Sequence, residues 1–475
     1  MNVRDFVRIA ILKTNSLWPF STWNKVPYRF AVRAFIQAFK VFPEIRSIYL
    51  RHGLVERTWV PAVSDIDFTL IISSQMTDEQ EFAFLRNFWK RYRTFKKLFP
   101  MLGEIEILNE QQFGSFTKFK IWGYESFEWK LVHGQETLKS NYLATPFRLK
   151  VDSLNHAVWF YLDFLLQRFY DNAKPAYLIS CEMRRIASKV LRYANYNSRD
   201  EMKVEEEIPR EKAEIVCFVL KRLDQSVYEF LLQHKTTPVG SDWNQEWRRR
   251  EFEKVPDNGF VFNELIPFRN TIKSILLSSY NRDQVLLDAV SDIFILKSCI
   301  NSIRDSFAGQ ERTPTLITSG IFEYMMRFFD PYLYTHLMKC SRVAMGDDIL
   351  PGIQPPDPCF FAQKVLYQVP TLLIHSRSEK LILPLDSNRY SEKAFESIIN
   401  RGLFIKLYLE KGVLCYRYSD LMQETHRNYP DVYERLRKCA SSGLESFRLM
   451  RSITTDIHNA LQDSRKLQDL YSMNV

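Results

Sequence analysis

Two aspartates separated by one residue open an apolar segment in the first third of the chain. The segment SDIDFTLIIS contains Asp65 and Asp67, and its β-branched and aromatic residues predict a strand. Because successive side chains of a strand point to opposite faces, the two carboxylates project together while Ile66 and Phe68 enter the core. Two ionised carboxylates this close repel each other, and a hard cation that prefers oxygen ligands, Mg²⁺ or Mn²⁺, relieves the repulsion. We therefore expect Asp65 and Asp67 to bind metal.

A second segment with carboxylates on one face follows later. In GEIEIL, residues 103–108, Glu104 and Glu106 alternate with isoleucines and therefore share a face of a strand. A third carboxylate on a neighbouring strand completes a two-metal site, in which one ion activates an attacking hydroxyl and the other neutralises a triphosphate and its leaving pyrophosphate. We expect Glu106 to be this metal ligand because it lies deeper in the strand, with Glu104 as the alternative.

Residues around the turn before the aspartates are candidates to bind the nucleotide. Gly53 lies twelve positions before Asp65, where a glycine lets backbone N–H groups approach phosphate oxygens. Arginines flank this turn and either hold phosphates or serve as counter-charges to the carboxylates. Ser64 is expected to order the turn into the strand. The nucleotide-binding candidates are Arg51, His52, Gly53, Arg57 and Ser64.

The elements that position these residues follow from the spacing of apolar side chains. Periods of three to four indicate helices and alternation indicates strands. A threonine followed by acidic residues marks the start of the helix between the two carboxylate strands. The predicted elements are a helix at 28–42, strands at 47–53, 64–73 and 103–108, a helix at 77–98, and a short strand at 129–132. They predict a small mixed sheet with flanking helices over residues 1–142.

The rest of the chain predicts two further regions, so the fold class is α+β. Residues 143–350 form a mainly helical domain, with helices at 152–171, 176–194, 211–234 and 283–307. The segment GIQPPDP, residues 352–358, marks a boundary. Residues 351–475 form a small α+β region, with short strands at 371–376, 380–385 and 402–418 around a helix at 391–400. No internal repeat is evident.

Composition places the chain among folded cytoplasmic proteins. A length of 475 residues exceeds one ordinary core, and 46% hydrophobic and 14% aromatic residues are typical of a globular protein. The longest apolar stretch, residues 157–166, is too short to cross a bilayer, so no membrane span is predicted. Seven scattered cysteines form no CxxC pair, which argues against a disulfide framework or zinc site and favours the reducing cytoplasm.

The net charge of +9 favours polyanionic partners such as nucleotides, nucleic acid or an anionic membrane face. Residues 1–47 contain eight basic and two acidic residues among many aromatics. One interpretation is a basic amphipathic surface helix for a membrane or for phosphates. The other, which is simpler, is a helix packed on its domain with a solvated basic face.

The stretch YLRHGLVERTWVPAVSDIDFTLI resembles the core motif of the DNA polymerase beta type nucleotidyltransferase superfamily. That motif is a Gly-Ser or Gly-Gly turn, a spacer, D-x-D in a strand, and a later Asp or Glu in another strand. The resemblance covers residues 30–134. It implies transfer of a nucleoside monophosphate from a nucleoside triphosphate, with Mg²⁺ or Mn²⁺, onto an acceptor that is a small molecule, a protein or a nucleic-acid end.

The chain departs from that motif at one turn, where His52-Gly53 or Gly53-Leu54 replaces Gly-Ser. This departure supports an alternative: a catalytically silent protein of the same fold that binds nucleotide, nucleic acid or another protein. P-loop, GxGxxG and GxSxG patterns are absent from the sequence, which argues against P-loop kinase, Rossmann and serine hydrolase functions. The acceptor, the preferred base and the oligomeric state do not follow from the sequence.

Overall fold

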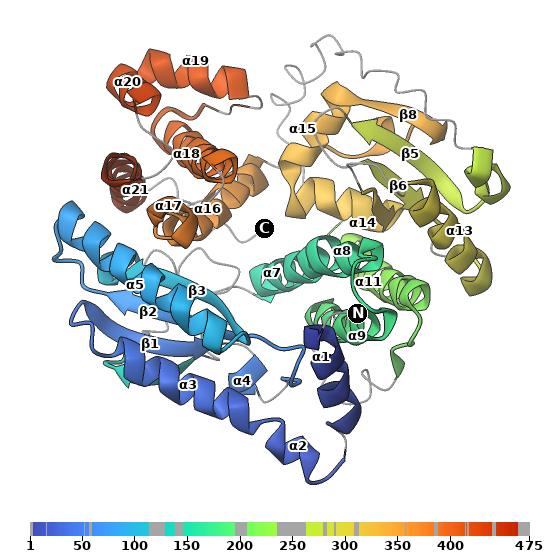
Figure 1. Ribbon diagram of the computed structural model, residues 1–475. Coiled ribbons are helices and arrows are strands. Elements are labelled where there is room, and N and C mark those ends of the chain that lie inside the picture. Colours follow the sequence, from blue (N-terminus) through green and yellow to red (C-terminus); the bar gives the residue numbers. More distant parts are fainter. Residues whose placement is uncertain are drawn as a thin grey trace. The chain divides into compact units, whose positions relative to one another are not determined.

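The computed structural model describes most of the chain. The described residues are 3–15, 17–51, 53–56, 59–113, 129–137, 146–194, 207–234, 263–278, 283–288, 291–307, 313–356, 358–383, 388–413, 415, 418–438 and 443–463. They form two compact units, each with its own four-stranded sheet (Figure 1). The sheet A unit comprises residues 7–143 and 365–473, and the sheet B unit comprises chiefly residues 144–364. Within the described residues, no helix is apolar and long enough to span a bilayer.

Sheet A has the strand order β3-β2-β1-β4. β1 runs antiparallel to β2 and β4, whereas β2 and β3 are parallel, as their connection through a helix requires. The strands are β1 (Ile45–Arg51), β2 (Ile66–Ile72), β3 (Leu102–Asn109) and β4 (Lys130–Gly134). The strands expected in the first part of the chain are confirmed, and together with the helices they give the mixed α+β class.

Two helices cover one face of sheet A with aromatic side chains. Phe35 of α3 stacks on Phe68 of β2, with ring centroids 4.1 Å apart, and Phe88 of α5 belongs to the same core. A capping box between Thr77 and Gln80 begins α5 at the residue predicted from the sequence. The helices of this segment are α1 (Val3–Thr14), α2 (Phe20–Trp23), α3 (Val26–Phe39), α4 (Gly53–Glu56) and α5 (Asp78–Leu98).

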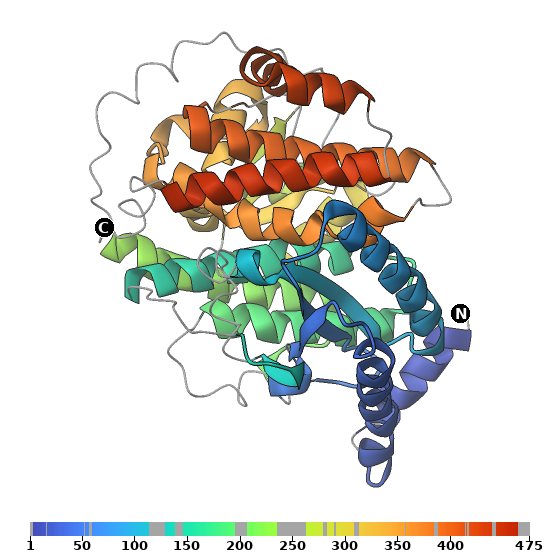
Figure 2. The same cartoon turned by 90° about the vertical axis from the view of Figure 1, so that its left-hand side faces the viewer.

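The C-terminal part of the sheet A unit is helical in its described residues. Its helices are α16 (Pro358–His375), α17 (Glu379–Ile382), α18 (Asn388–Lys411), α19 (Tyr418–Asn428), α20 (Pro430–Lys438) and α21 (Leu444–Asp463). Figure 2 shows α18 and α21 side by side. The strands expected at 371–376 and 380–385, and the first half of the one expected at 402–418, are wrong, because their described residues lie in or directly after α16, α17 and α18. Residues 384–385, 414 and 416–417 of these predictions lie outside the described residues. Pro370 lies inside α16 and does not end that helix.

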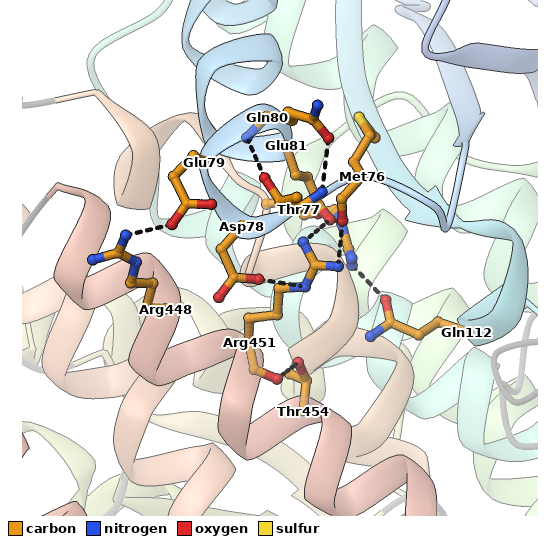
Figure 3. A network of polar contacts seen from close by, with 11 residues as sticks. Met76, Thr77, Asp78, Glu79, Gln80, Glu81, Gln112, Arg448, Arg451 and Thr454 are labelled. Carbon is orange, nitrogen blue, oxygen red and sulfur yellow. Dashed lines mark hydrogen bonds and ion pairs between the residues drawn. The ribbon is translucent and has the colours of Figure 1, made fainter.

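A buried ion cluster ties α5 to these C-terminal helices (Figure 3). The Glu81 carboxylate is fully buried and lies 2.7 Å from Arg377 Nε and 2.8 Å from Arg451 Nη1. Arg377 also donates to Gln112 Oε1 at 2.6 Å, and Arg451 Nε lies 3.0 Å from Asp78 Oδ1. Because a buried charge is tolerated only when paired, this cluster ties residues of 365–473 to the helix behind β2.

The sheet B unit contains a sheet where the sequence predicts only helices. Its strands are β5 (Ile272–Ser278), β6 (Gln284–Leu287), β7 (Thr315–Thr318) and β8 (Ser341–Gly346). Its helices are α7 (Pro146–Trp159), α8 (Leu166–Tyr170), α9 (Ala176–Ala194), α11 (Lys212–Gln233), α13 (Ile293–Ser306), α14 (Ser319–Tyr324) and α15 (Pro331–Cys340). The helix expected at 283–307 is wrong in its first part, because QVLL is a buried strand whose short apolar run has no helical or strand periodicity.

Sheet B repeats sheet A in topology. Its order is β7-β6-β5-β8, with β5 antiparallel to β6 and β8 and with β6 parallel to β7. The register irregularities also recur: one lies between Ile45 and Ser47 of β1, and another between Ile272 and Ser274 of β5. The described residues therefore contain a structural repeat that the sequence analysis did not expect.

A matching glycine ends the fourth strand of each sheet. Gly134 and Gly346 both have positive φ, +88° and +79°. A Cβ at Gly134 would lie 1.8 Å from the carbonyl oxygen of Arg46, and one at Gly346 would lie 2.1 Å from that of Lys273. Glycine is needed at both positions because a side chain would be strained by backbone conformation and by this close approach.

Candidate active site

The polar face of sheet A lies opposite α3 and α5. Ile66, Phe68 and Leu70 of β2 point into the core that these helices cover. Strand alternation therefore directs Asp67, which lies between Ile66 and Phe68, to the other face, and Asp65 lies directly before β2. Asp65 is exposed and Asp67 is half-buried, so both carboxylates are accessible at the beginning of β2.

β3 places its two glutamates beside this pair. β2 and β3 are parallel neighbours, and Thr69 is the register partner of Glu106. Arg51, on the last position of β1, reaches both Glu104 and Glu106, so the two glutamates share its face of the sheet. The aspartates of β2 and the glutamates of β3 thus meet on one side of adjacent strands.

Gly103 creates the space that the aspartates occupy. The β2–β3 register shifts between Ile66 and Phe68, which leaves an extra residue on β3 opposite Asp67. A Cβ at Gly103 would lie 2.2 Å from Asp67 Oδ1 and 2.7 Å from Asp65 Cβ. The sequence predicts Gly103 only as the start of a strand. Its position one residue before Glu104 is the signal that could have identified its role.

Backbone contacts hold Asp67 in place. Its Oδ1 accepts a hydrogen bond of 2.7 Å from the backbone N–H of Glu104. From the helix side, the Tyr92 hydroxyl donates to the carbonyl oxygen of Gly103 at 2.7 Å. Burial raises the pKa of Tyr92 above its ordinary value, and the charges of Asp67, Glu379 and Asp65 raise it further. Tyr92 therefore remains a protonated donor, and its hydrogen bond stabilises the β-bulge that the extra residue of β3 forms opposite Asp67.

Arg51 is a counter-charge within the site. Its side chain is fully buried, and its Nη1 lies 2.9 Å from Glu106 Oε1, which is also fully buried. Glu106 accepts a second contact, from Thr69 Oγ1 at 3.2 Å, and the exposed carboxylate of Glu104 lies 3.6 Å from Arg51 Nη2. Trp129 covers the guanidinium, with Arg51 Cζ 5.8 Å from the ring centroid. Of the two roles open from the sequence, this geometry supports the counter-charge.

The carboxylates meet some of the needs of a divalent metal and not others. Within the described residues, no three His, Cys, Asp or Glu side chains converge as a ligand group. Mg²⁺, however, is commonly bound by one or two carboxylates together with substrate phosphates and water. The adjacent oxygen donors of Asp65 and Asp67 suit a hard cation of this kind, whereas Glu106 is occupied by Arg51.

The remaining predicted nucleotide-binding residues lie after β1, where His52, Gly53 and Arg57 are found, and before β2, where Ser64 is found. Gly53 begins the short helix α4 directly after the turn that follows β1, and His52 and Arg57 lie outside the described residues. Ser64 is buried and its hydroxyl accepts a 2.6 Å hydrogen bond from the N–H of Val60, while Tyr28 donates to the Ser64 carbonyl at 3.1 Å. Ser64 thus orders the turn into β2, and its hydroxyl is engaged there.

No protein-family model, curated protein or solved structure matches the chain. The function must therefore be argued from the residues themselves. The strongest features are the paired aspartates of β2, the glycine that accommodates them, and the glutamates of the parallel neighbour β3.

Proposed function

We propose that the chain is a metal-dependent nucleotidyltransferase that moves a nucleoside monophosphate from a nucleoside triphosphate onto an acceptor. The observation that carries this proposal is the position of Asp65 and Asp67 at the beginning of β2, on the face of sheet A that also presents Glu104 and Glu106. Gly103 supports it, because a glycine at a bulge is what allows both aspartate side chains to lie against β3. The acceptor is a small molecule, a protein or a nucleic-acid end.

In this proposal Asp65 and Asp67 hold Mg²⁺ or Mn²⁺ together with the triphosphate. The metal supplies charge neutralisation at the phosphates and lowers the pKa of a bound hydroxyl. The contact from the Glu104 N–H fixes the Asp67 side chain, so the pair is oriented before the nucleotide arrives. Gly53, at the start of α4, gives the triphosphate a side-chain-free approach to the backbone.

We assign the third carboxylate to Glu104 and not to Glu106. The Glu104 side chain is 56% exposed and its backbone N–H contacts Asp67, whereas the side chain of Glu106 has no exposed surface and is paired with Arg51. Releasing Glu106 to a metal would leave the Arg51 charge buried with less compensation, which is costly. Moving Glu104 to a metal weakens its longer contact of 3.6 Å with Arg51 but leaves the Arg51–Glu106 pair in place.

The buried Arg51–Glu106 pair also favours a second candidate function. A site whose deepest carboxylate is permanently neutralised suits a silent protein of this fold, which binds nucleotide, nucleic acid or a partner protein without turnover. In that case Asp65 and Asp67 still bind a metal–nucleotide complex, and no product forms.

The experiment is label transfer from each of the four ribonucleoside triphosphates with Mg²⁺ or Mn²⁺. Wild type is compared with Asp65→Asn/Asp67→Asn, which removes both charges and keeps the oxygen that accepts from Glu104. We expect at least about a 100-fold loss of turnover, because the metal's share of stabilisation is several kcal/mol. Asp288→Asn, directly after β6 of sheet B, is the matched control and should turn over as wild type.

Two further variants separate the glutamates. Glu104→Gln should lower turnover without lowering stability, since its side chain is largely exposed. Glu106→Gln should lower stability, because the buried Arg51 charge then has less compensation. Equal turnover in wild type and the double aspartate variant would reject the proposal. Metal-dependent nucleotide binding without any transfer would support the silent candidate.

A further inference from the structure

An arm of three helices at the N-terminus presents aromatic side chains to solvent. Figures 1 and 2 show α2 at the end of the arm that α1 and α3 form. Trp18 is 85% exposed and Trp23 is 63% exposed, and Phe20 packs edge-on against Trp23 with centroids 6.0 Å apart. Leu17 and Val26, on either side of them, are also more than half exposed. These side chains make one apolar tip, residues 17–26.

The charge around this tip has one sign. Residues 6–43 contain six Lys or Arg and no Asp or Glu. The exposed basic residues are Lys13 of α1, Arg29 and Arg33 of α3, and Lys40 directly after α3. An apolar tip next to a predominantly basic segment is complementary to a surface that is anionic outside and apolar just beneath.

The arm is anchored on the sheet A unit, so its tip is held in position. Tyr28 of α3 is buried and its hydroxyl accepts from the N–H of Ala62 at 2.8 Å, while Arg8 of α1 donates to the Ala62 carbonyl at 2.8 Å. The Asn24 side chain after α2 donates to the carbonyl of Ile11 in α1 at 3.3 Å. The exposed aromatic residues therefore project from an ordered support.

We propose that the tip, residues 17–26, binds the surface of an anionic phospholipid bilayer. The two tryptophans insert at the headgroup level, where amphipathic rings are favoured, and the basic residues of α1 and α3 contact anionic headgroups. Nucleic acid fits less well. The aliphatic side chains of Leu17 and Val26 gain little from contact with bases or phosphates, whereas a bilayer would bury them. This attachment is independent of the nucleotide site and places sheet A next to a membrane.

The test is flotation of the full chain with vesicles of phosphatidylcholine alone or with an equal part of phosphatidylglycerol. Wild type should float with the anionic vesicles, and added salt should release it. Trp18→Ser/Trp23→Ser and Arg29→Gln/Arg33→Gln should each weaken binding by roughly tenfold or more. Phe294→Ser is the matched control, because Phe294 of α13 is 74% exposed but lies outside the arm; it should float as wild type.

Circular dichroism of each variant establishes that it is folded. A second readout, quenching of tryptophan fluorescence by brominated lipid, should disappear in the Trp18→Ser/Trp23→Ser variant. Failure of wild type to float with anionic vesicles, or unchanged flotation of that double variant, would overturn the proposal. Binding of a single-stranded oligonucleotide that both arm variants lose, without flotation of wild type, would assign the tip to nucleic acid instead.

Discussion

Sheets A and B share a framework and differ in the chemistry of their faces. When the strand registers of the two sheets are matched, Glu106 of β3 is equivalent to Thr315 of β7, and Arg51 of β1 is equivalent to Ser278 of β5. Thr313, two residues before Thr315, is equivalent to Glu104, which is two residues before Glu106. Sheet B thus has hydroxyl side chains where sheet A has its buried ion pair and third carboxylate.

The aspartates also lack counterparts. Counting back along β6, the positions of Asp65 and Asp67 correspond to Tyr280 and Arg282, which lie outside the described residues. The helices behind the sheets differ in the same way. The caps Thr77 and Asp292 are equivalent, and counting from them aligns the buried Glu81 with the buried Leu296.

The comparison separates what the fold needs from what the site needs. Topology, strand irregularities and terminal glycines recur in both sheets, so they belong to the framework. Glu104, Glu106 and Arg51 are replaced by hydroxyl residues at the matching described positions of sheet B, so they belong to the proposed site and not to the shared framework. The following substitutions test this division.

The largest expected effect is loss of the buried ion pair of sheet A. Glu106→Gln leaves Arg51 charged and buried, and should lower the free energy of unfolding by about 3–5 kcal/mol. Urea unfolding measures it. The double variant Arg51→Met/Glu106→Gln should recover most of the loss, and Thr315→Val, at the matching position of sheet B, should cost about 1 kcal/mol. A small effect of Glu106→Gln would contradict the assignment of Arg51 as counter-charge.

The shared glycines should be equally intolerant of substitution. Gly134→Ala and Gly346→Ala each add a side chain at positive φ against a backbone carbonyl, and each should cost roughly 2–4 kcal/mol of stability. Thermal and urea unfolding measure both variants. If only one of the two is destabilised, the two sheets do not share the framework in the way proposed.

The bulge glycine should matter for sheet A chemistry. Gly103→Ala pushes Asp65 and Asp67 away from β3 and should cost about 1–3 kcal/mol, with at least a tenfold loss of nucleotide turnover. Gly352→Ala is the control, because nothing lies within 4 Å of the added Cβ. Wild-type turnover in Gly103→Ala would show that the exact position of the aspartates is unimportant.

The smallest expected effect concerns Tyr92. Counted from the helix caps Thr77 and Asp292, its equivalent in the sheet B unit is Phe307, which has no hydroxyl group. Tyr92→Phe removes the hydrogen bond to Gly103 and should cost about 1 kcal/mol near neutral pH. Because the folded-state pKa of Tyr92 is raised, its contribution is complete below the unfolded pKa of about 10 and is lost as pH rises further. Urea midpoints above that pH should therefore fall more steeply for wild type than for Tyr92→Phe. Parallel curves would contradict this.

The sequence predicts sheet A well and sheet B poorly for a physical reason. Strands such as GEIEIL alternate between core and polar face, and Thr77 with Gln80 encodes a capping box, so local signals suffice. QVLL is buried on both faces and carries no alternation. In the same way, the apolar run in α18 has strand-like composition and is nevertheless helical.

The site was predictable in its residues and not in its contacts. Strand alternation places Asp65 with Asp67 and Glu104 with Glu106, but which glutamate stays accessible depends on Arg51. That pairing follows from the antiparallel register of β1 on β2, which no local pattern specifies. The role of Gly103 likewise depends on a bulge that forms between two strands.

The central claim is that Asp65 and Asp67 bind a metal–nucleotide complex. The most direct measurement is equilibrium binding of labelled nucleoside triphosphates with and without Mg²⁺, for wild type, Asp65→Asn/Asp67→Asn and the control Asp288→Asn. We expect metal-dependent binding in wild type and control, and at least about tenfold weaker binding in the double variant at unchanged stability. Binding by the double variant as tight as that of wild type, or no metal-dependent binding by wild type, would contradict the account.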